Sequence, residues 1–432
     1  MNTLDNLRRT LDQHAEDVAD PAAVARTAAV HHRVAVVRRR RRALGAGALA
    51  LALVAGIGMA LVPHGDGDAL PAAPVVLGEK APTTMDSLGY TYRTDGTAES
   101  GTRRVGVVVT RSDQPQLYSW AADQATEVTV HVPGGEVWDS VYAHFGDFVV
   151  VPPGTSGRLT VVAPAGQVGV ARYTLTDTPP AGYTRNGVTY RASVAGRSLL
   201  GAAVAAPGST EAGTEVQLPR GRVELAPLCT GVPSGYDVLV TVDGHNIVSG
   251  DCSDPTAFDP AGAGGYISRL GAAGSTVAIT VVLTKGTHGT IPATGDFPHL
   301  KLGIGAYDEA SSYGPDQRVA GIRVENAVEH GGHLWLGSGS HSSQGAPIDV
   351  PGAAVDQVAT LTWRTSGFVR ATFAVQGETP QGGEFANGPG RGTGAMPDLW
   401  VPADRAVRAH LDHGKGPFAV VFYQRAAVER SD

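Results

Sequence analysis

The sequence predicts a mainly β fold, made of tandem antiparallel β-sandwich modules of the immunoglobulin-like or jelly-roll-like kind, with an N-terminal helical tail and one transmembrane helix. Three observations support this prediction. The 432 residues include 57 glycines and 28 prolines but only 17% charged residues. Short runs rich in valine and threonine, such as 127–132 and 276–283, alternate with turn residues every ~8–12 positions. One apolar segment, 43–62, has no charged residue.

Segment 43–62 has the length that a membrane-spanning helix requires, because a hydrocarbon core of ~30 Å takes about 20 apolar residues. Five arginines precede it: Arg38, Arg39, Arg40, Arg41 and Arg42. Basic residues stay on the cytoplasmic side, where they contact anionic membrane lipid. We therefore expect an uncleaved signal anchor, with the N-terminus in the cytoplasm and the C-terminal bulk outside the cell membrane. The alternative, a cleaved signal peptide, has a shorter apolar core and a shorter leader.

Composition divides the chain into six segments. We expect a cytoplasmic helical tail at 1–42, the transmembrane helix at 43–62, a Gly/Pro/Ala-rich linker at 63–85 and β-sandwich modules at 86–182, 183–303 and 304–432. An internal repeat suggests the module limits. Leu88-Gly-Tyr-Thr-Tyr-Arg93 matches Asn186-Gly-Val-Thr-Tyr-Arg191, and a weaker third copy starts at Ala306-Tyr307 and continues into Arg318–Val324. The period is the size of a domain, and either two or three modules fit it.

The tail carries leucines at helical spacing, namely Leu4, Leu7 and Leu11. A segment of this size is too short to bury a core of its own. Two roles stay open for it. It is either an amphipathic segment that its arginines hold on the membrane, or a helix that docks a cytoplasmic regulatory protein.

A family resemblance bears on this choice. The order Leu4-Asp-Asn-Leu7-Arg-Arg-Thr-Leu11, His14-Ala-Glu-Asp-Val18, the arginine block, the apolar span and a β-rich exterior resembles a set of uncharacterised actinobacterial single-pass membrane proteins. The resemblance covers the first ~65 residues. Members of that set are often encoded near extracytoplasmic-function sigma factors, which implies an anti-sigma or signalling role. The chain does not carry the His/Cys/Cys zinc motif of the best-known anti-sigma domains.

Both cysteines, Cys229 and Cys252, follow the apolar segment. An oxidising exterior makes a disulfide between them the expected state, one that stabilises and does not catalyse. The segments before the two cysteines suggest neighbouring strands, with an Asp243-Gly244 hairpin turn.

The charge distribution bears on possible partners. The net charge is −7, and the tail holds nine arginines against five carboxylates, so the exterior carries about −11. An acidic exterior without a basic stripe excludes nucleic acid as its expected partner.

No local motif predicts catalysis, a cofactor or a metal, so we expect a protein that is not an enzyme. The chain has no Gly-x-Ser-x-Gly elbow, and Gly337-Ser-Gly-Ser-His341 is predicted as a turn. Glu329, His330, His333 and His341 form the densest histidine cluster, but the spacing is not that of a closed zinc site, which favours a surface turn. The acidic pairs Asp66/Asp68 and Asp251/Asp254 lack the spacing of a calcium loop.

Two features concern binding. The glycine-rich stretch 380–397 is predicted as an exposed hairpin loop and is our candidate for ligand contact. The tryptophans are predicted as core anchors and are Trp120, Trp138, Trp335, Trp363 and Trp400. We therefore expect a membrane-anchored protein with a non-catalytic binding, sensing or structural role at the cell envelope, and with an envelope glycan or protein as its ligand. The alternative is a transmembrane regulator that acts through residues 1–42.

Overall fold

The computed structural model describes residues 73–124, 127–134, 137–140, 144–252, 266–286, 291–365, 368–377, 380–386, 392–396 and 398–426. These residues form strands β1 to β32, and every strand pair is antiparallel, which confirms the mainly β prediction. In this part of the chain no helix is long and apolar enough to cross a bilayer. The predicted tail (1–42) and transmembrane helix (43–62) lie outside the described residues.

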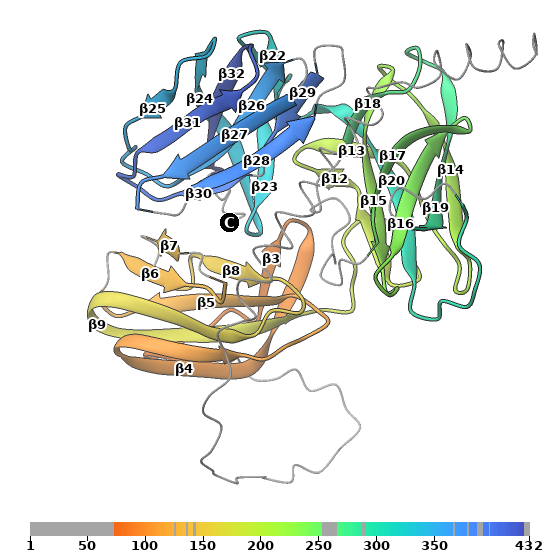
Figure 1. Cartoon of the computed structure of the whole chain (residues 1–432). Helices are drawn as coiled ribbons and strands as arrows, with labels where there is room; N and C mark the ends of the chain where they lie inside the picture. The colour runs from red at the N-terminus through yellow and green to blue at the C-terminus, as the bar shows by residue number, and fades with distance from the viewer. Residues whose placement is uncertain are drawn as a thin grey trace, which may run out of the picture.

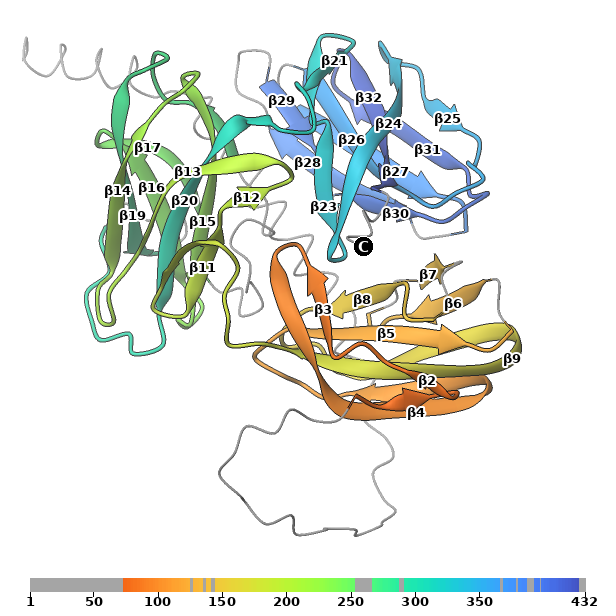
Figure 2. The same cartoon turned by 180° about the vertical axis from the view of Figure 1, so that it is seen from behind.

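The strands gather into three modules (Figures 1 and 2). The first contains β1 (Val75–Val76), β2 (Glu79–Lys80), β3 (Thr84–Ser87), β4 (Tyr90–Val109), β5 (Gln116–Ala122), β6 (Val128–His131), β7 (Val137–Ser140), β8 (Phe148–Val151) and β9 (Gly157–Leu175). All but β1 and β2 belong to one sheet, which folds over itself because β4 and β9 bend together midway. Residues 160–162 of β9 pair with β6, whereas residues 168–174 pair with β5. Each long strand thus serves two layers with a shared core.

The second module contains β10 (Gly182–Arg185), β11 (Val188–Arg191), β12 (Ser193–Val194), β13 (Arg197–Val204), β14 (Glu211–Gln217), β15 (Arg222–Thr230), β16 (Tyr236–Val242), β17 (His245–Asp251), β18 (Tyr266–Arg269), β19 (Thr276–Lys285) and β20 (Lys301–Ser311). A five-stranded sheet, β12-β13-β20-β15-β18, faces a four-stranded one, β14-β19-β16-β17. Alternate residues of both sheets are buried in one core, for example Leu225 and Ile304 against Val240 and Ile279. This is the inward and outward alternation of a β-sandwich.

The third module contains β21 (Gln317–Val319), β22 (Ile322–Val324), β23 (Ala327–His330), β24 (His333–Ser343), β25 (Ile348–Val350), β26 (Gln357–Thr365), β27 (Phe368–Val375), β28 (Gln381–Ala386), β29 (Gly392–Ala395), β30 (Leu399–Val401), β31 (Val407–His413) and β32 (Phe418–Arg425). The sheet β23-β24-β32-β26-β29, to which β30 adds, faces the sheet β25-β31-β27-β28. Their core contains Leu361, Trp363 and Phe418 on one side and Phe373 on the other.

The sequence repeat corresponds to a hairpin near the start of each module. Leu88-Gly89 connects β3 to β4, and Asn186-Gly187 connects β10 to β11, in both cases with two residues of positive φ. The tyrosine that follows is almost fully buried in both modules. In the third module the corresponding hairpin is β21–β22, which turns at Ala320-Gly321, whereas Ala306-Tyr307 lies in the middle of β20.

Two of the predicted segment boundaries fall inside β-sheets. The expected linker includes residues 75–85, yet these form β1, β2 and the start of β3. The limit at 303/304 cuts β20, which pairs with β13 and β15 in the second module. Strand pairing therefore extends the second module to Ser311.

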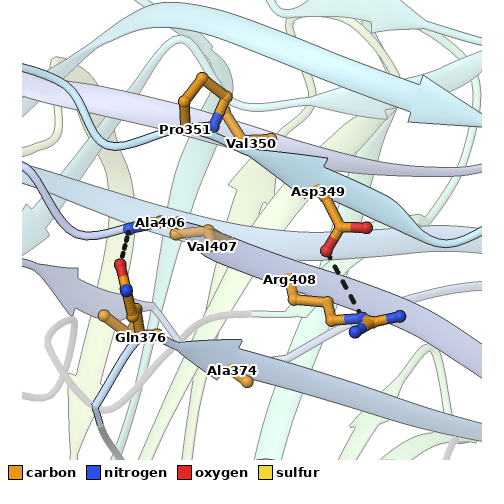
Figure 3. A pocket seen from close by; sticks show the side chains of 9 residues that line it. Asp349, Val350, Pro351, Ala374, Gln376, Ala406, Val407 and Arg408 are labelled. Carbon is orange, nitrogen blue, oxygen red and sulfur yellow. Dashed lines mark hydrogen bonds and ion pairs between the residues drawn. The ribbon is translucent and has the colours of Figure 1, made fainter.

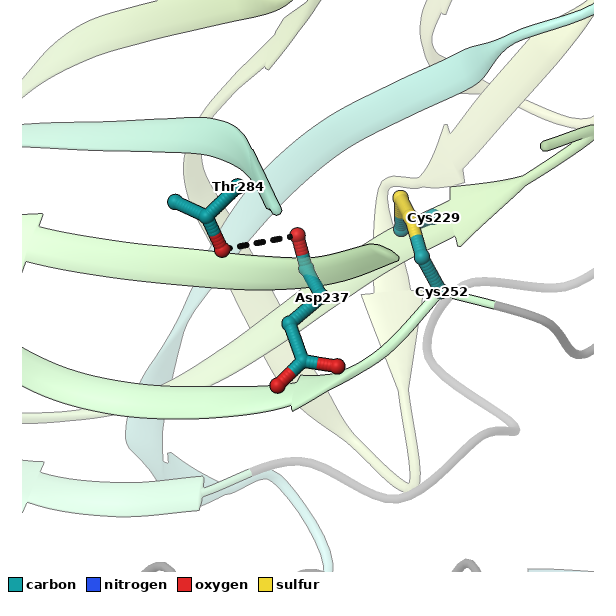
Figure 4. The surroundings of a disulfide bond; sticks show 4 residues. All are labelled: Cys229, Asp237, Cys252 and Thr284. Carbon is teal, nitrogen blue, oxygen red and sulfur yellow. Dashed lines mark hydrogen bonds between the residues drawn. A yellow bond between two sulfur atoms is a disulfide. The ribbon is translucent and has the colours of Figure 1, made fainter. Parts of the chain in front are cut away.

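Cys229 and Cys252 pair as a disulfide, with their Cα atoms 4.8 Å apart (Figure 4). Cys229 lies near the end of β15 and Cys252 directly after β17, so the bond joins the two facing sheets of the second module. The expectation of neighbouring strands was wrong in this respect. The Asp243-Gly244 turn is confirmed, because it closes the β16–β17 hairpin between Val242 and His245. Close to the disulfide, the Thr284 hydroxyl donates to the Asp237 carbonyl.

Candidate functional site

The three modules meet where the tip of the β23–β24 hairpin enters the first module (Figures 1 and 2). The tip is His330-Gly331-Gly332-His333, and the Ser87 hydroxyl of β3 donates to the Gly332 carbonyl at 2.7 Å. We call this region the junction. It contains Glu329, His330 and His333 of the predicted histidine cluster, and the groups that pack around it come from sequence positions 87 to 425.

Both glycines of the tip are required by backbone conformation and by space. Their φ angles are +60° at Gly331 and +84° at Gly332, in the left-handed region that favours glycine. A Cβ atom on Gly331 would lie 2.2 Å from the Trp138 ring, and one on Gly332 would lie 2.7 Å from a methyl group of Val150. The tip can enter the first module because it has no side chain at these two positions.

His333 is buried at the junction between an aromatic ring and an ion pair. Its ring stacks on Phe148 at 4.2 Å, and its Nε2 lies 3.0 Å from the Phe148 carbonyl and against the Arg425 guanidinium. Arg425, from β32, donates to both carboxylate oxygens of the buried Asp147 at 2.8 Å. Burial, with a smaller contribution from Arg425, lowers the pKa of His333 to about 3. The imidazole is therefore neutral at physiological pH, and it serves as packing.

Three of the five tryptophans contact one another at the junction. Trp138 of β7 lies 4.3 Å from Trp400 and 6.4 Å from Trp335 between ring centroids, and Trp335 and Trp400 meet edge to face at 5.4 Å. The Trp335 Nε1 donates to the His330 carbonyl at 3.0 Å. Trp120 and Trp363 are almost fully buried within their own modules. The prediction of core anchors is confirmed for these two, for Trp335 and for Trp138, whereas Trp400 is only partly buried and packs against the core. Trp138 and Trp400 form the seam between modules.

A second buried ion pair connects the hairpin with the second module. Arg191, at the end of β11, makes two contacts with the Glu329 carboxylate, and the two side chains are only 4% and 10% exposed. The Ala195 amide also donates to Glu329, at 2.8 Å. Arg191 donates in addition to the Leu88 carbonyl of the first module at 3.0 Å and lies over the Tyr90 ring. One guanidinium thus contacts all three modules.

A network of arginines and carboxylates continues this contact between the second and third modules. Arg197 of β13 lies 3.3 Å from Glu224, 3.8 Å from Asp316 and 3.6 Å from Glu325. Arg323 of β22 pairs with Asp316 and, at 2.7 Å, with Glu309 of β20. Burial lowers the pKa of Arg197, but its carboxylate neighbours outweigh burial and raise it overall. These ion pairs hold the β21–β22 hairpin of the third module against the second module.

The predicted surface turn at the histidines was wrong, because two glycines in a row suggested exposure where they allow close approach. His333 is only 7% exposed, and Glu329 binds Arg191. His341 lies far along β24, where it meets Phe422 edge to face at 6.0 Å. Among the described residues no group of three or more His, Cys, Asp or Glu side chains is arranged to hold a metal.

Two other predicted turns are strands. Gly337-Ser-Gly-Ser-His341 belongs to β24, with a bulge at Gly337/Gly339, and the Ser338 hydroxyl donates to the Phe422 carbonyl. Within 380–397, β28 pairs with β27 and β29 pairs with β26 of the facing sheet, so the stretch crosses between sheets. Residues 387–391 and 397 lie outside the described part. Asp251 is the last residue of β17, while Asp66, Asp68 and Asp254 fall outside the described residues.

A shallow hollow of about 490 Å³ lies on the outer face of the sheet β25-β31-β27 (Figure 3). Its lining is mostly apolar and comprises Asp349, Val350, Pro351, Ala374, Val375, Gln376, Ala406, Val407 and Arg408. Asp349 and Arg408 form an exposed ion pair at 3.4 Å on one side, and Gln376 accepts a hydrogen bond from the Ala406 amide on the other. The small side chains of Ala374 and Ala406 leave the sheet open between these polar groups.

Sequence reasoning missed the partners of the hairpin tip. Arg191, Asp147 and Arg425 were not predicted. In the structure Arg191 ends a run, Val188-Thr-Tyr-Arg, in which every residue is buried, and a charged residue in such a strand requires a partner. The sequence did not show that burial.

No family model matches the chain, and no curated protein matches it. One similar solved structure is described as "Structure of infectious bursal disease virus Gt strain". The match has 14% sequence identity, covers 78% of each chain and has a TM-score of 0.13, which is too low to support an argument about fold or function.

Proposed function

We propose that this chain is a single-pass membrane protein whose exterior has a non-catalytic binding, sensing or structural role at the cell envelope. The observation that carries the proposal is the arginine block Arg38–Arg42 directly before the uncharged segment 43–62. This order places the N-terminus in the cytoplasm and the β modules outside. The disulfide Cys229–Cys252 supports the placement, since structural disulfides persist in oxidising compartments.

The junction supports the non-catalytic part of the proposal. The residues whose types first suggested chemistry, His333 and Glu329, are engaged with Phe148, Arg425 and Arg191. A buried neutral imidazole between packed rings holds modules together and has no access to a substrate. The hollow beside Asp349 and Arg408 is the concave surface that we propose for a ligand of the envelope, either a glycan or a protein.

Single-cysteine labelling tests the orientation. Ile291→Cys puts a thiol at an exposed position of the second module, and Ala22→Cys puts one in the tail. A membrane-impermeant maleimide should label Ile291→Cys in intact cells and Ala22→Cys only after the membrane is permeabilised. Labelling of Ala22→Cys in intact cells would refute the orientation, and extraction of the protein by alkaline carbonate would refute the anchor.

Sedimentation of the detergent-solubilised full chain with purified envelope tests the binding role. Ala374→Trp fills the hollow and should reduce the fraction of protein retained in the envelope pellet. Glu211→Trp, at an exposed position of the second module, should leave that fraction unchanged. Equal retention of both variants would remove the hollow from the proposal.

A second candidate function is regulation of a cytoplasmic protein, of the anti-sigma kind. It is favoured by the helical spacing of Leu4, Leu7 and Leu11 in the sequence and by the resemblance of the N-terminal layout to actinobacterial membrane proteins encoded near sigma factors. Full-length protein and a variant with all three leucines changed to serine are purified from cells and compared. A partner recovered only with the native leucines supports regulation. Identical partners with both would reduce the tail to an anchor.

A further inference from the structure

The first module has an outward face that carries unpaired arginines, although the exterior as a whole is acidic. The face is formed by residues 104–109 of β4 and 157–162 of β9, whose alternate side chains fill the core. The opposite alternation exposes Arg104, Val108 and Arg158. Together with Arg103 we call these residues the arginine face.

The backbone of β4 and β9 brings these arginines together. Arg103 has a φ of +61° and lies where β4 bends from one layer to the other, so its side chain is exposed at the bend. Arg158 lies across Gly106, because a Cβ there would meet its Nη1 atom at 2.6 Å. Gly106 is about 7 Å along the strand from Arg104. The missing side chain at Gly106 thus lets the Arg158 guanidinium lie flat on the surface that Arg104 shares.

Unlike the arginines of the junction, those of the arginine face have no counter-charge. Within the described residues, Arg103, Arg104 and Arg158 make no ion pair or hydrogen bond, whereas Arg191 and Arg197 are each paired at the junction. Other titratable groups on this layer include His131 on β6, which pairs with Thr160, and Glu127 before β6, both exposed, as well as Asp139 of β7, which pairs with Thr129. Val108, the direct cross-strand partner of Arg158, is 55% exposed and adds an apolar contact to the positive charge.

The position of the module along the chain indicates what this face meets. Residues 63–74 separate the apolar segment from β1, and a tether of that length spans at most about 40 Å. Such a tether keeps the first module at a millimolar-range effective concentration at the membrane surface. Even a weak attraction between arginines and anionic headgroups is then sufficient for docking.

We propose that the arginine face docks the first module on anionic lipid headgroups at the outer surface of the membrane that anchors the chain. This inference rests on the proposed anchor at 43–62. Docking would hold the exterior in one orientation to the bilayer. Because the contact is electrostatic and exposed, salt should weaken it.

The test uses the full chain reconstituted in vesicles of phosphatidylcholine alone or with about one-third phosphatidylglycerol. Thr110→Cys, exposed just after β4, carries a donor fluorophore attached by an impermeant reagent, and the outer leaflet carries a headgroup acceptor dye. Energy transfer should rise with phosphatidylglycerol and fall at high salt. Arg104→Glu/Arg158→Glu should lower the ratio of docked to undocked protein at least tenfold, since each arginine contributes about fivefold.

The control is Arg220→Glu/Arg318→Glu, which makes the same charge change at exposed positions of the second and third modules and should keep the lipid response. Vesicle flotation measures the anchor separately, and all variants should float. Equal energy transfer in both lipid mixtures, or equal loss in both double variants, would overturn the docking proposal. Failure to float would instead overturn the anchor. Unchanged near-ultraviolet circular dichroism of the variants establishes that each is folded.

Discussion

Removal of the Glu329 carboxylate is expected to destabilise the junction strongly. Glu329→Ala leaves the Arg191 guanidinium without its counter-ion and the Ala195 amide without its acceptor, in a place where the Arg191 side chain is 4% exposed. Breaking a buried ion pair from one side costs about 3–5 kcal/mol of unfolding free energy, because an uncompensated charge stays buried. The exposed pair Asp349–Arg408 is the matched control, and Asp349→Ala should cost no more than about 1 kcal/mol.

The assay is urea unfolding of the full chain in lipid nanodiscs, followed by tryptophan fluorescence and near-ultraviolet circular dichroism. Trp138, Trp335 and Trp400 lie at the junction with ring centroids 4.3 to 6.4 Å apart, so their signal reports separation of the modules. In Glu329→Ala the signal of the junction tryptophans should be lost at a lower urea concentration than the signal of the module cores.

A double variant distinguishes an ion pair from simple loss of packing. Arg191→Met/Glu329→Leu removes both charges and keeps apolar volume, so it should recover most of the stability that Glu329→Ala loses. A cost below about 1 kcal/mol for Glu329→Ala, or a double variant that is less stable than the single one, would refute the reasoning.

Three further predictions concern the same architecture. As the pH falls from 6.5 towards 3, the wild type should lose more unfolding free energy than His333→Gln. The reason is that the histidine is protonated in the unfolded chain, whereas buried His333 stays neutral in the folded protein until the pH reaches about 3. Urea unfolding midpoints at pH 7.5, 5 and 4 measure this difference. Gly331→Ala should lower the unfolding free energy by about 2–4 kcal/mol, because φ is positive there and the new Cβ clashes with the Trp138 ring. Gly208→Ala should lower it by about 1 kcal/mol, because φ is also positive but the surrounding space is open. Replacing Cys229 and Cys252 by serine should cost about 3 kcal/mol, as thermal unfolding with and without reductant can check.

Much of the local structure could be predicted from sequence, because it depends on alternation and turn chemistry. Alternating runs such as 276–283 predicted strands with one buried face, and β19 has that pattern. The Asp243-Gly244 turn was predicted from two residues that tolerate positive φ. The repeated Gly-x-Thr-Tyr-Arg motif corresponds to a hairpin near the start of the first two modules, where a local signal determines a local structure.

The junction could not be predicted in this way, because its contacts join distant positions. Ser87 meets Gly332 across 245 positions, and Asp147 meets Arg425 across 278. Periodicity indicates that a residue is buried but not which module buries it. Glycine is equally ambiguous, since it suits an exposed turn and a close approach of backbones alike. The cluster at His330–His333 looked exposed for this reason.

The junction also limits how a signal could pass from the exterior to the tail. Modules of one chain usually move relative to each other unless their interface is large and apolar. Here the tryptophan seam and the pairs Arg191–Glu329 and Arg425–Asp147 connect the third module to both neighbouring modules, and breaking the buried Arg191–Glu329 pair from one side costs about 3–5 kcal/mol. A ligand on the third module would therefore displace all three modules together. If the tail regulates a cytoplasmic protein, the quantity it transmits is the position of the whole exterior relative to the membrane, which docking through Arg104 and Arg158 would set.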